Sequence, residues 1–298
     1  MEYRDNARID HSRVRYGGGS GGGGRRRGGL AIGGGAGGIV LLLLAVFLGP
    51  SLGIDPMALL GGTDYEPEPQ VVQQKSGCVT GADVAENRDC RWDAYYVALD
   101  DYWSSVVDGY ESPEMEIFSG QVSTACGMGA TEMGPFYCPG DKTIYVDSTF
   151  LGQLLDQLGA KGGDAAELYV VGHEWGHHIS NLTGDMERAR SRNDGSGPTS
   201  GQVRLELQAD CYAGVFFDNT VRDPESPIEK VTADDLKRIA DAASAVGDDH
   251  IQKQQGGRVV PESWTHGSSA MRQYWVDKGF SSGDPRSCDT LNTDELGG

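Results

Sequence analysis

Apolar residues form two kinds of pattern along this chain of 298 residues. The first is a run without any charged residue from Gly28 to Ile54, in which residues 30–50 are apolar or glycine apart from a final proline. About 20 such residues in a helix suffice to cross a bilayer, so the run predicts one N-terminal transmembrane helix at 30–50. A cleaved signal peptide is the alternative, although residues 51–53 give only a weak cleavage pattern.

The charges on either side of this helix predict its orientation. Seven arginines precede it, whereas acidic residues follow it. The positive-inside rule therefore predicts a cytoplasmic, flexible Gly/Arg-rich tail at 1–29, a linker at 51–77 and an extracytoplasmic domain at 78–298. Glycines spaced four apart within the helix would let two copies pack closely, so a homodimer is an open alternative to a monomer.

The second pattern begins beyond Cys78, where apolar positions recur at helical spacing. This periodicity predicts helices at 89–102, 148–159, 164–184, 202–218 and 268–279. The β-branched and aromatic run Thr143 to Asp147 predicts a short strand, and the polar residues 185–201 predict a long loop between two helices. We therefore expect an α+β domain that is mainly helical.

The excess of acidic over basic residues limits the kinds of molecule that this protein can bind. Lys and Arg number 25 and Asp and Glu number 44, which gives a formal net charge of -19. Because seven basic and three acidic residues lie in the first fifty positions, the rest of the chain carries 18 basic and 41 acidic residues, or -23. Nucleic-acid binding depends on Lys and Arg neutralising phosphates, so this composition argues against a nucleic-acid partner.

All six cysteines follow the apolar run, which agrees with an oxidising location outside the cytoplasm. Six cysteines allow 15 pairings. Loop-closure entropy favours the two pairs that lie about a dozen residues apart, which leaves the last two cysteines to close a long loop. The favoured pairs are Cys78–Cys90, Cys126–Cys138 and Cys211–Cys288. Reduced, buried thiols are the alternative.

The helix expected at 164–184 contains the pattern H-E-x-x-H at residues 173–177. Residues four apart share one face of a helix, so His173 and His177 can bind one zinc ion while Glu174 lies beside them and faces a zinc-activated water. The alternative is a helix with two incidental histidines. Three of the six histidines of the chain cluster here, which favours the metal site.

A catalytic zinc site has three protein ligands and one open position. The helix expected at 202–218 carries Glu206 and Asp210 four residues apart on one face. Glu206 can supply the third ligand, and Asp210 can accept the remaining ring N–H of a ligating histidine. The alternative is a solvated pair on a charged helix face, which is the commoner location of acidic residues.

Four segments together resemble a known family. They are GPFYCPGDKTIYVD at 134–147, HEWGHHISNLTG at 173–184, RLELQADCYAG at 204–214 and RVVPESWTHGSSAMRQYW at 258–275. H-E-x-x-H followed by a helix with E-x-x-x-D is similar to the gluzincin class of zinc metallopeptidases. The four segments are similar to the bacterial family of putative neutral zinc metallopeptidases. The resemblance runs from about Cys78 to the C-terminus and leaves the Gly/Arg-rich tail outside.

The resemblance implies a zincin-like domain behind one membrane anchor of the bacterial cell membrane, with Zn²⁺ as cofactor and a peptide or protein as substrate. Carried over residue by residue, it implies zinc ligation by His173, His177 and Glu206, and orientation of a ligand by Asp210. It also implies that Glu174 acts as general base. Zinc chemistry then predicts that Glu174 takes a proton from a zinc-activated water and delivers it to the leaving amine.

The residue that stabilises the oxyanion is left open. His266 and Tyr274 are the candidates, because zinc peptidases often place a His or Tyr donor opposite the base. His266 is equally well explained as a turn residue before the helix at 268–279. The strand Thr143–Val146 precedes the metal helix, and an edge strand in the gluzincin arrangement pairs with an extended substrate.

Two other functions are consistent with these residues. One is a zinc-bearing but catalytically idle binding or scaffold protein at the cell surface, which would need the three ligands but not Glu174. The other is a zinc amidase that acts on cell-wall material. Assays with and without a chelator separate the first alternative from a peptidase, and comparison of peptides with peptidoglycan fragments separates the second.

Overall fold

The computed structural model describes residues 1–9, 12–17, 72–73 and 77–298. They form a mixed α and β fold that is about half helical. The predicted transmembrane helix at 30–50 and most of the linker at 51–77 lie outside the described residues. Within the described part, no helix combines the length and the apolar character that crossing a membrane requires.

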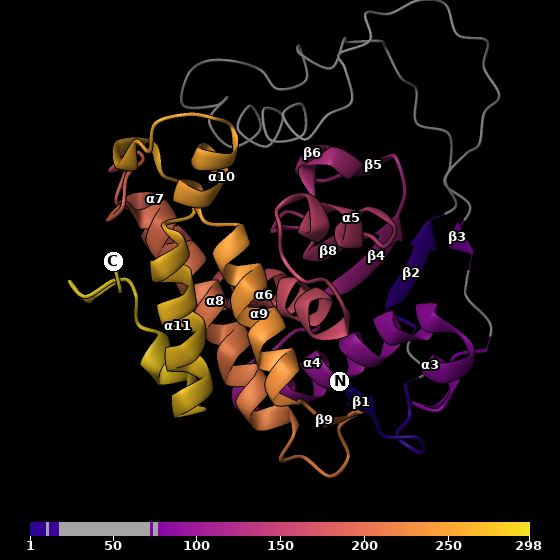
Figure 1. Ribbon diagram of the computed structural model, residues 1–298. Coiled ribbons are helices and arrows are strands. Elements are labelled where there is room, and N and C mark those ends of the chain that lie inside the picture. The colour runs from indigo at the N-terminus through magenta and orange to yellow at the C-terminus, as the bar shows by residue number, and fades with distance from the viewer. Residues whose placement is uncertain (10–11, 18–71, 74–76) are drawn as a thin grey trace, which may run out of the picture.

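A five-stranded sheet forms one side of the molecule (Figure 1). In spatial order its strands are β3 (Val72–Gln73), β2 (Val14–Gly17), β4 (Glu114–Phe118), β8 (Thr143–Asp147) and β7 (Phe136–Cys138). The central strands β2, β4 and β8 are parallel, whereas β3 and β7 run antiparallel to their neighbours. The predicted strand at Thr143–Asp147 is confirmed, but it lies inside the sheet, and β7 forms the edge.

The N-terminal residues belong to this fold. Strand β2 pairs with β4, and β1 (Glu2–Tyr3) pairs antiparallel with β9 (Ile228–Lys230). The amino group of Met1 forms an ion pair with Asp235 at 2.9 Å. The prediction of a flexible tail at 1–29 is therefore wrong for residues 1–9 and 12–17. The strand partners of β1 and the β4 partners of β2 lie more than a hundred positions away, so a local pattern cannot show them.

This strand pairing also bears on the predicted membrane topology. A helix that crossed the bilayer once between residues 17 and 72 would put its two flanks on opposite sides of the membrane. Residues 14–16 hydrogen-bond with residues 115–117 in one sheet, so these two parts of the chain lie on the same side. A cytoplasmic N-terminus combined with an extracytoplasmic domain does not agree with this sheet.

Replacing Ile9 by alanine distinguishes a folded N-terminus from a flexible one. Ile9 has no exposed surface and packs against the Cys78–Cys90 disulfide. We therefore expect Ile9→Ala to lower the free energy of unfolding by about 2–5 kcal/mol. Val79, which is 50% exposed, is the matched control, and Val79→Ala is expected to change it by no more than about 0.5 kcal/mol. Equal, small effects in urea denaturation would contradict the packing of the N-terminal segment.

The five predicted helices are confirmed with small shifts at their ends. They are α4 (Arg91–Val106), α5 (Phe150–Gln157), α6 (Asp164–Leu182), α8 (Gly201–Thr220) and α11 (Ser269–Ser282). The loop predicted at 185–201 begins instead with a short helix, α7 (Asp185–Ser191). Helices α3 (Asp83–Glu86), α9 (Ala233–Ala245) and α10 (Asp248–Gln254) are absent from the sequence prediction.

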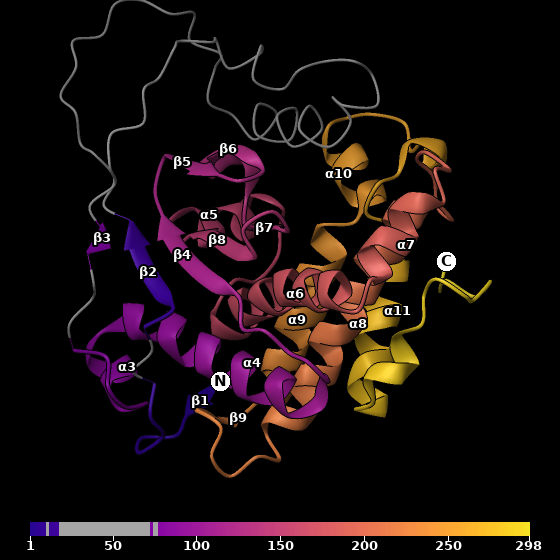
Figure 2. The same ribbon diagram turned by 180° about the vertical axis from the view of Figure 1, so that it is seen from behind.

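Helix α6 lies between the sheet and the layer formed by α8, α9 and α11, as both views show (Figures 1 and 2). Gly176 lets α6 approach α8 closely, because a Cβ atom at this position would lie 2.7 Å from the Cα of Ala209. This glycine is one of the two free positions of H-E-x-x-H. The close approach brings the histidine face of α6 against the acidic face of α8.

Three disulfides fasten the periphery, and the favoured pairing is confirmed. They are Cys78–Cys90, Cys126–Cys138 and Cys211–Cys288. The second links the turn of the hairpin β5 (Gln121–Thr124) and β6 (Gly127–Ala130) to the edge strand β7. The third ties α8 to the segment that follows α11. The first disulfide joins Cys78 to the residue before α4. The three disulfides thus restrain α4, β7 and α8, which all contact α6.

Candidate metal centre

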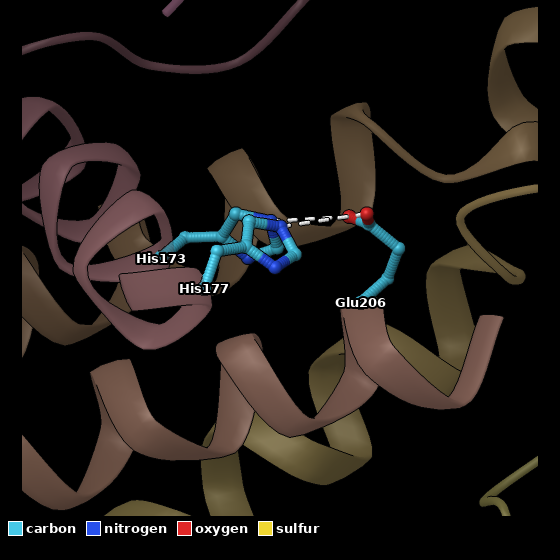
Figure 3. Close-up of side chains that lie close together, drawn as sticks. All are labelled: His173, His177 and Glu206. Atoms are coloured by element: carbon cyan, nitrogen blue, oxygen red, sulfur yellow. Dashed lines mark hydrogen bonds and ion pairs between the residues drawn. The ribbon is translucent and has the colours of Figure 1, made fainter. Parts of the chain in front are cut away.

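Three side chains from two helices converge on one point (Figure 3). His173 and His177 lie one turn apart on α6, and Glu206 faces them from α8. A carboxylate oxygen of Glu206 lies 3.1 Å from Nε2 of His173, and the other lies 3.4 Å from Nε2 of His177. Among the described residues, this group can offer three ligand atoms within 4.8 Å of one another.

These three side chains are close enough to contact one zinc ion. Zinc–ligand bonds of about 2.0–2.2 Å at the tetrahedral angle separate neighbouring ligand atoms by about 3.3–3.6 Å. The two imidazole nitrogens lie 3.1 and 3.4 Å from different oxygens of Glu206, and one atom from each residue lies within 4.8 Å of the other two. Two histidines and one carboxylate also leave a fourth position open, which is typical of catalytic zinc sites. The structure thus brings together the three ligands selected from the sequence.

His173 is held in the orientation that ligation requires. Its Nδ1 lies 2.8 Å from Oδ1 of Asp210, so the ring donates there and directs Nε2 toward Glu206. Burial lowers the pKa of His173, but the adjacent Asp210 carboxylate outweighs burial and raises the pKa to about 10. The raised pKa favours the protonated imidazole, and a metal ion bound at Nε2 would replace the proton on that nitrogen.

His177 differs from His173 in its support. Its Nδ1 is buried and has no hydrogen-bond partner among the described residues. The other ring nitrogen faces Glu206. The two imidazoles of the site are therefore not equivalent, since Nδ1 of His173 is bound by a carboxylate and Nδ1 of His177 is not.

Asp210 forms the centre of a buried polar cluster. Besides His173, its carboxylate accepts hydrogen bonds from the hydroxyl of Tyr169 at 2.6 Å and from two nitrogens of Arg272 at 2.8 Å each. Burial raises the pKa of Asp210, but the charges of Arg272 and His173 outweigh burial and lower the pKa to about 2. Tyr169 and Arg272 are absent from the sequence prediction. The only signal for Arg272 is its place in the segment 258–275 that carries the family resemblance.

Glu174 lies beside the ligands without belonging to them. Its side chain is buried and lines the same cavity as both histidines. Burial raises the pKa of Glu174, while the two neighbouring histidines lower it to a smaller extent. A buried carboxylate with a raised pKa that lines the same cavity as the candidate ligands is suited to exchange a proton during a reaction.

A cavity of about 650 Å³ opens at the candidate metal centre. One wall is apolar and comes from α5, the first half of α6 and the region from α9 to α10. It includes Leu154, Leu155, Leu158, Val170, Val246 and Ile251. The opposite wall lies around α7 and the turn that follows it, and it is more polar, with Arg190, Asn193, Asp194 and Ser196. The cavity is far larger than an ion and its water require, and it suits a substrate with two chemically different sides.

His266 lines this cavity, but Tyr274 is not among the described residues that do. The backbone N–H of His266 donates to Oδ2 of Asp248 at 2.7 Å, and its Nδ1 lies 3.4 Å from Oδ1 of the same carboxylate. Burial lowers the pKa of His266, while Asp248 and Glu206 together raise it. His266 is therefore close enough to Glu206 to sense its charge. Tyr274 packs instead against Trp275.

The other described histidines have structural environments. Nδ1 of His178 lies 2.9 Å from the hydroxyl of Tyr137, and Nε2 lies 2.7 Å from the carbonyl oxygen of Glu111. Burial lowers the pKa of His178 to about 4, so this ring is neutral. His250 contacts the carbonyl oxygen of Leu158 at 2.9 Å. Tyr137 belongs to β7, so His178 fastens the edge strand to the helix of the candidate metal centre.

Comparison with known proteins agrees with this site. The sequence profile of the family described as "Putative neutral zinc metallopeptidase" matches residues 1–291, and thus includes the N-terminal residues that the motif resemblance left out. An uncharacterized protein of Mycobacterium tuberculosis is 44% identical over 253 residues, covering 83% of this chain and 86% of its own length. The uncharacterized protein YpfJ of Escherichia coli is 42% identical over 185 residues, which cover 61% of this chain and 62% of YpfJ. No solved structure matches.

Proposed function

The chain belongs to the family of putative neutral zinc metallopeptidases, and we propose that it hydrolyses peptide bonds with one zinc ion held by His173, His177 and Glu206. The observation that carries this proposal is the convergence of three ligands with an open fourth position beside a large cavity. Bound zinc supplies Lewis-acid activation of a water molecule and of the substrate carbonyl. The rest of the reaction is assigned to side chains of this chain.

Glu174 acts as the general base. Glu174 follows His173 in α6 and lines the cavity, and its raised pKa favours capture of a proton from the attacking water. It accepts a proton from the attacking water and then delivers that proton to the leaving amine.

We assign to His266 the role of stabilising the oxyanion. It lines the cavity from a different segment than the ligands, and Asp248 favours its protonated form. A protonated imidazole can donate a hydrogen bond to the negative charge that develops on the carbonyl oxygen. This role explains why a buried carboxylate is placed behind His266.

An extended peptide fits the shape of the site. Strand β7 forms the edge of the sheet, and Phe136 and Tyr137 of this strand line the cavity. An edge strand offers backbone N–H and C=O groups to which a peptide can add as a further strand. We therefore place the substrate along β7, and not along the interior strand β8.

The two walls of the cavity predict selectivity for a large apolar side chain next to the scissile bond. Full burial of a Leu or Phe side chain contributes about 1.5–3 kcal/mol, so kcat/KM is expected to be about 10- to 150-fold higher for Leu or Phe than for Gly at that position of matched peptides. Ile251→Asp, on the apolar wall, is expected to reduce this ratio. Val260→Asp is the control, because Val260 is exposed and lies outside the cavity lining. Equal rates for all peptides would contradict the assignment.

An extracytoplasmic location is supported by the three disulfides, because such bonds persist in oxidising compartments. Membrane attachment through residues 30–50 is part of the proposal, but not as a single crossing, because a single crossing would put the two flanks on opposite sides of the membrane. Both the N-terminal strands and the domain are placed on the outer side, since β2 and β4 share one sheet. Homodimer formation stays a prediction that no contact of the described residues addresses.

The function is tested with the purified full-length chain by elemental analysis together with cleavage of casein and of peptidoglycan fragments, with and without a chelator. One zinc per chain and chelator-sensitive cleavage of casein are the expected results. Zinc without cleavage of either substrate would favour the idle scaffold protein. Cleavage of peptidoglycan fragments alone would favour the amidase, and a folded chain without zinc would refute the metal site.

A further inference from the structure

A buried arginine lies directly behind the candidate metal centre. The side chain of Arg272, on α11, is only 4% exposed, and its guanidinium group binds Asp210 with two nitrogens. Its remaining contacts are longer: 3.2 Å to Nδ1 of His173, 3.4 Å to the carbonyl oxygen of Val246 and 3.4 Å to the hydroxyl of Tyr169. Two parallel hydrogen bonds from arginine to a carboxylate fix the plane of the carboxylate as well as its charge.

The carboxylate of Asp210 accepts four hydrogen bonds. Oδ1 accepts from His173, Tyr169 and Arg272, and Oδ2 accepts from Arg272 alone. Arg272 is thus the one donor that binds both oxygens of the carboxylate. Because Asp210 is also completely buried, no water competes for His173. The orientation of Asp210, and through it that of His173, is therefore set by the guanidinium group.

The cluster connects three helices at one point. Tyr169 and His173 come from α6, Asp210 from α8 and Arg272 from α11. His177 has no comparable support, since its Nδ1 lacks a hydrogen-bond partner among the described residues. The geometry of the whole ligand set consequently depends on the one histidine that Asp210 holds.

We propose that Arg272 is a positioning residue for the metal ion, which orients His173 mainly through Asp210 and also contacts its ring directly. This inference rests on the proposed function, because it requires that His173 binds zinc. Arg272 keeps the Asp210 carboxylate in the plane that receives Nδ1–H, and so keeps Nε2 directed at the ion. Lysine cannot replace it, since an ammonium group carries the charge without the planar pair of donors.

The competing explanation is that Arg272 merely joins α11 to α8. Arg91 provides a matched control, because it forms the same kind of pair with Glu167 of the metal-site helix α6, with N–O distances of 2.7 and 3.4 Å. That pair lies outside the cavity lining and the ligand set. Arg272→Lys and Arg91→Lys thus make the same chemical change to two helix-joining pairs, of which one supports a zinc ligand.

The experiment measures zinc affinity of the purified full-length chain by competition with a chromogenic chelator, and the visible spectrum of the cobalt-substituted protein. We expect Arg272→Lys to weaken zinc binding about 10- to 100-fold and to change the cobalt absorption bands. Arg91→Lys is expected to keep the affinity and spectrum of the wild type. Unchanged affinity and spectrum in Arg272→Lys, beside a wild type that binds zinc, would overturn the inference and leave the proposed function standing.

Tyr169→Phe is the second variant, in case Arg272→Lys does not fold. It removes one donor to the same Asp210 oxygen and keeps the ring in place. A weaker shift in the same direction is expected for both zinc affinity and cobalt spectrum, and no change in either would overturn the inference. A folded wild type that binds no zinc refutes the proposed function itself, and the inference with it.

Discussion

The variant Glu174→Gln is expected to retain one zinc per chain and to lose on the order of 10² to 10⁴ in kcat. Glutamine has nearly the same shape as glutamate but cannot accept and return a proton. Glu174 is absent from the group of three ligands, so its charge is not needed to hold the ion. Metal content by elemental analysis and kcat on one peptide, measured on the same preparation, check both halves of this expectation.

Asp194→Asn is a suitable control for Glu174→Gln. Asp194 also lines the cavity, but it pairs with Arg192 at 2.9 Å and caps the first N–H of α8. The same loss of charge at this position should leave kcat within a few-fold of the wild type. An undiminished kcat in Glu174→Gln would exclude it as the base, and loss of zinc in that variant would instead indicate a fourth ligand.

The variant Glu206→Ala is expected to lose zinc. Removal of one of three ligands leaves two histidines on a single helix, and the effect should exceed the 10- to 100-fold loss of affinity that is typical of residues behind the ligands. Activity should fall with the metal content and should recover in part when excess zinc is added. The two variants therefore separate the two roles. Glu174→Gln is expected to lose activity while it keeps the metal, and Glu206→Ala is expected to lose the metal itself.

Glu187→Ala serves as the control for Glu206→Ala, since Glu187 is an exposed acid on α7 that does not line the cavity. It should keep both zinc and activity. If Glu206→Ala bound zinc as tightly as the wild type, Glu206 would not be the third ligand, and the ligand spacing would have another explanation.

The ligands could be selected from sequence because the relevant geometry is local. Four residues make slightly more than one helical turn, so His173 and His177, and separately Glu206 and Asp210, share a face whatever surrounds them. That the two helices bring these side chains together could be predicted only from the resemblance of the two motifs to zinc peptidases. The disulfides followed from loop closure for the same reason, since two of them join residues only twelve apart.

Other features depend on contacts between distant segments. Strand β2 lies outside any apolar run and becomes a strand because β4 and β3 flank it. Asp164 is the first residue of α6, and its carboxylate accepts a hydrogen bond from Tyr3, which lies far away in the sequence, at 2.9 Å. Arg272 looks like an ordinary surface cation in the sequence, because only the folded chain places a carboxylate beside it. Helix α9 is absent from the prediction, although Thr232 and Asp235, which form its capping box, are a local signal for its start.

The position of strand β1 has a consequence for the order of events during synthesis. Glu2 pairs with Lys230, so strand β1 can find its partner only after the intervening chain has been made. At rates of about 5–20 residues per second, this interval is roughly 10 to 50 s. During it β1 must stay unpaired with β9, and aggregation or capture by another chain would compete with its insertion. The pairing of β1 with β9 is therefore a late event in the synthesis of this domain.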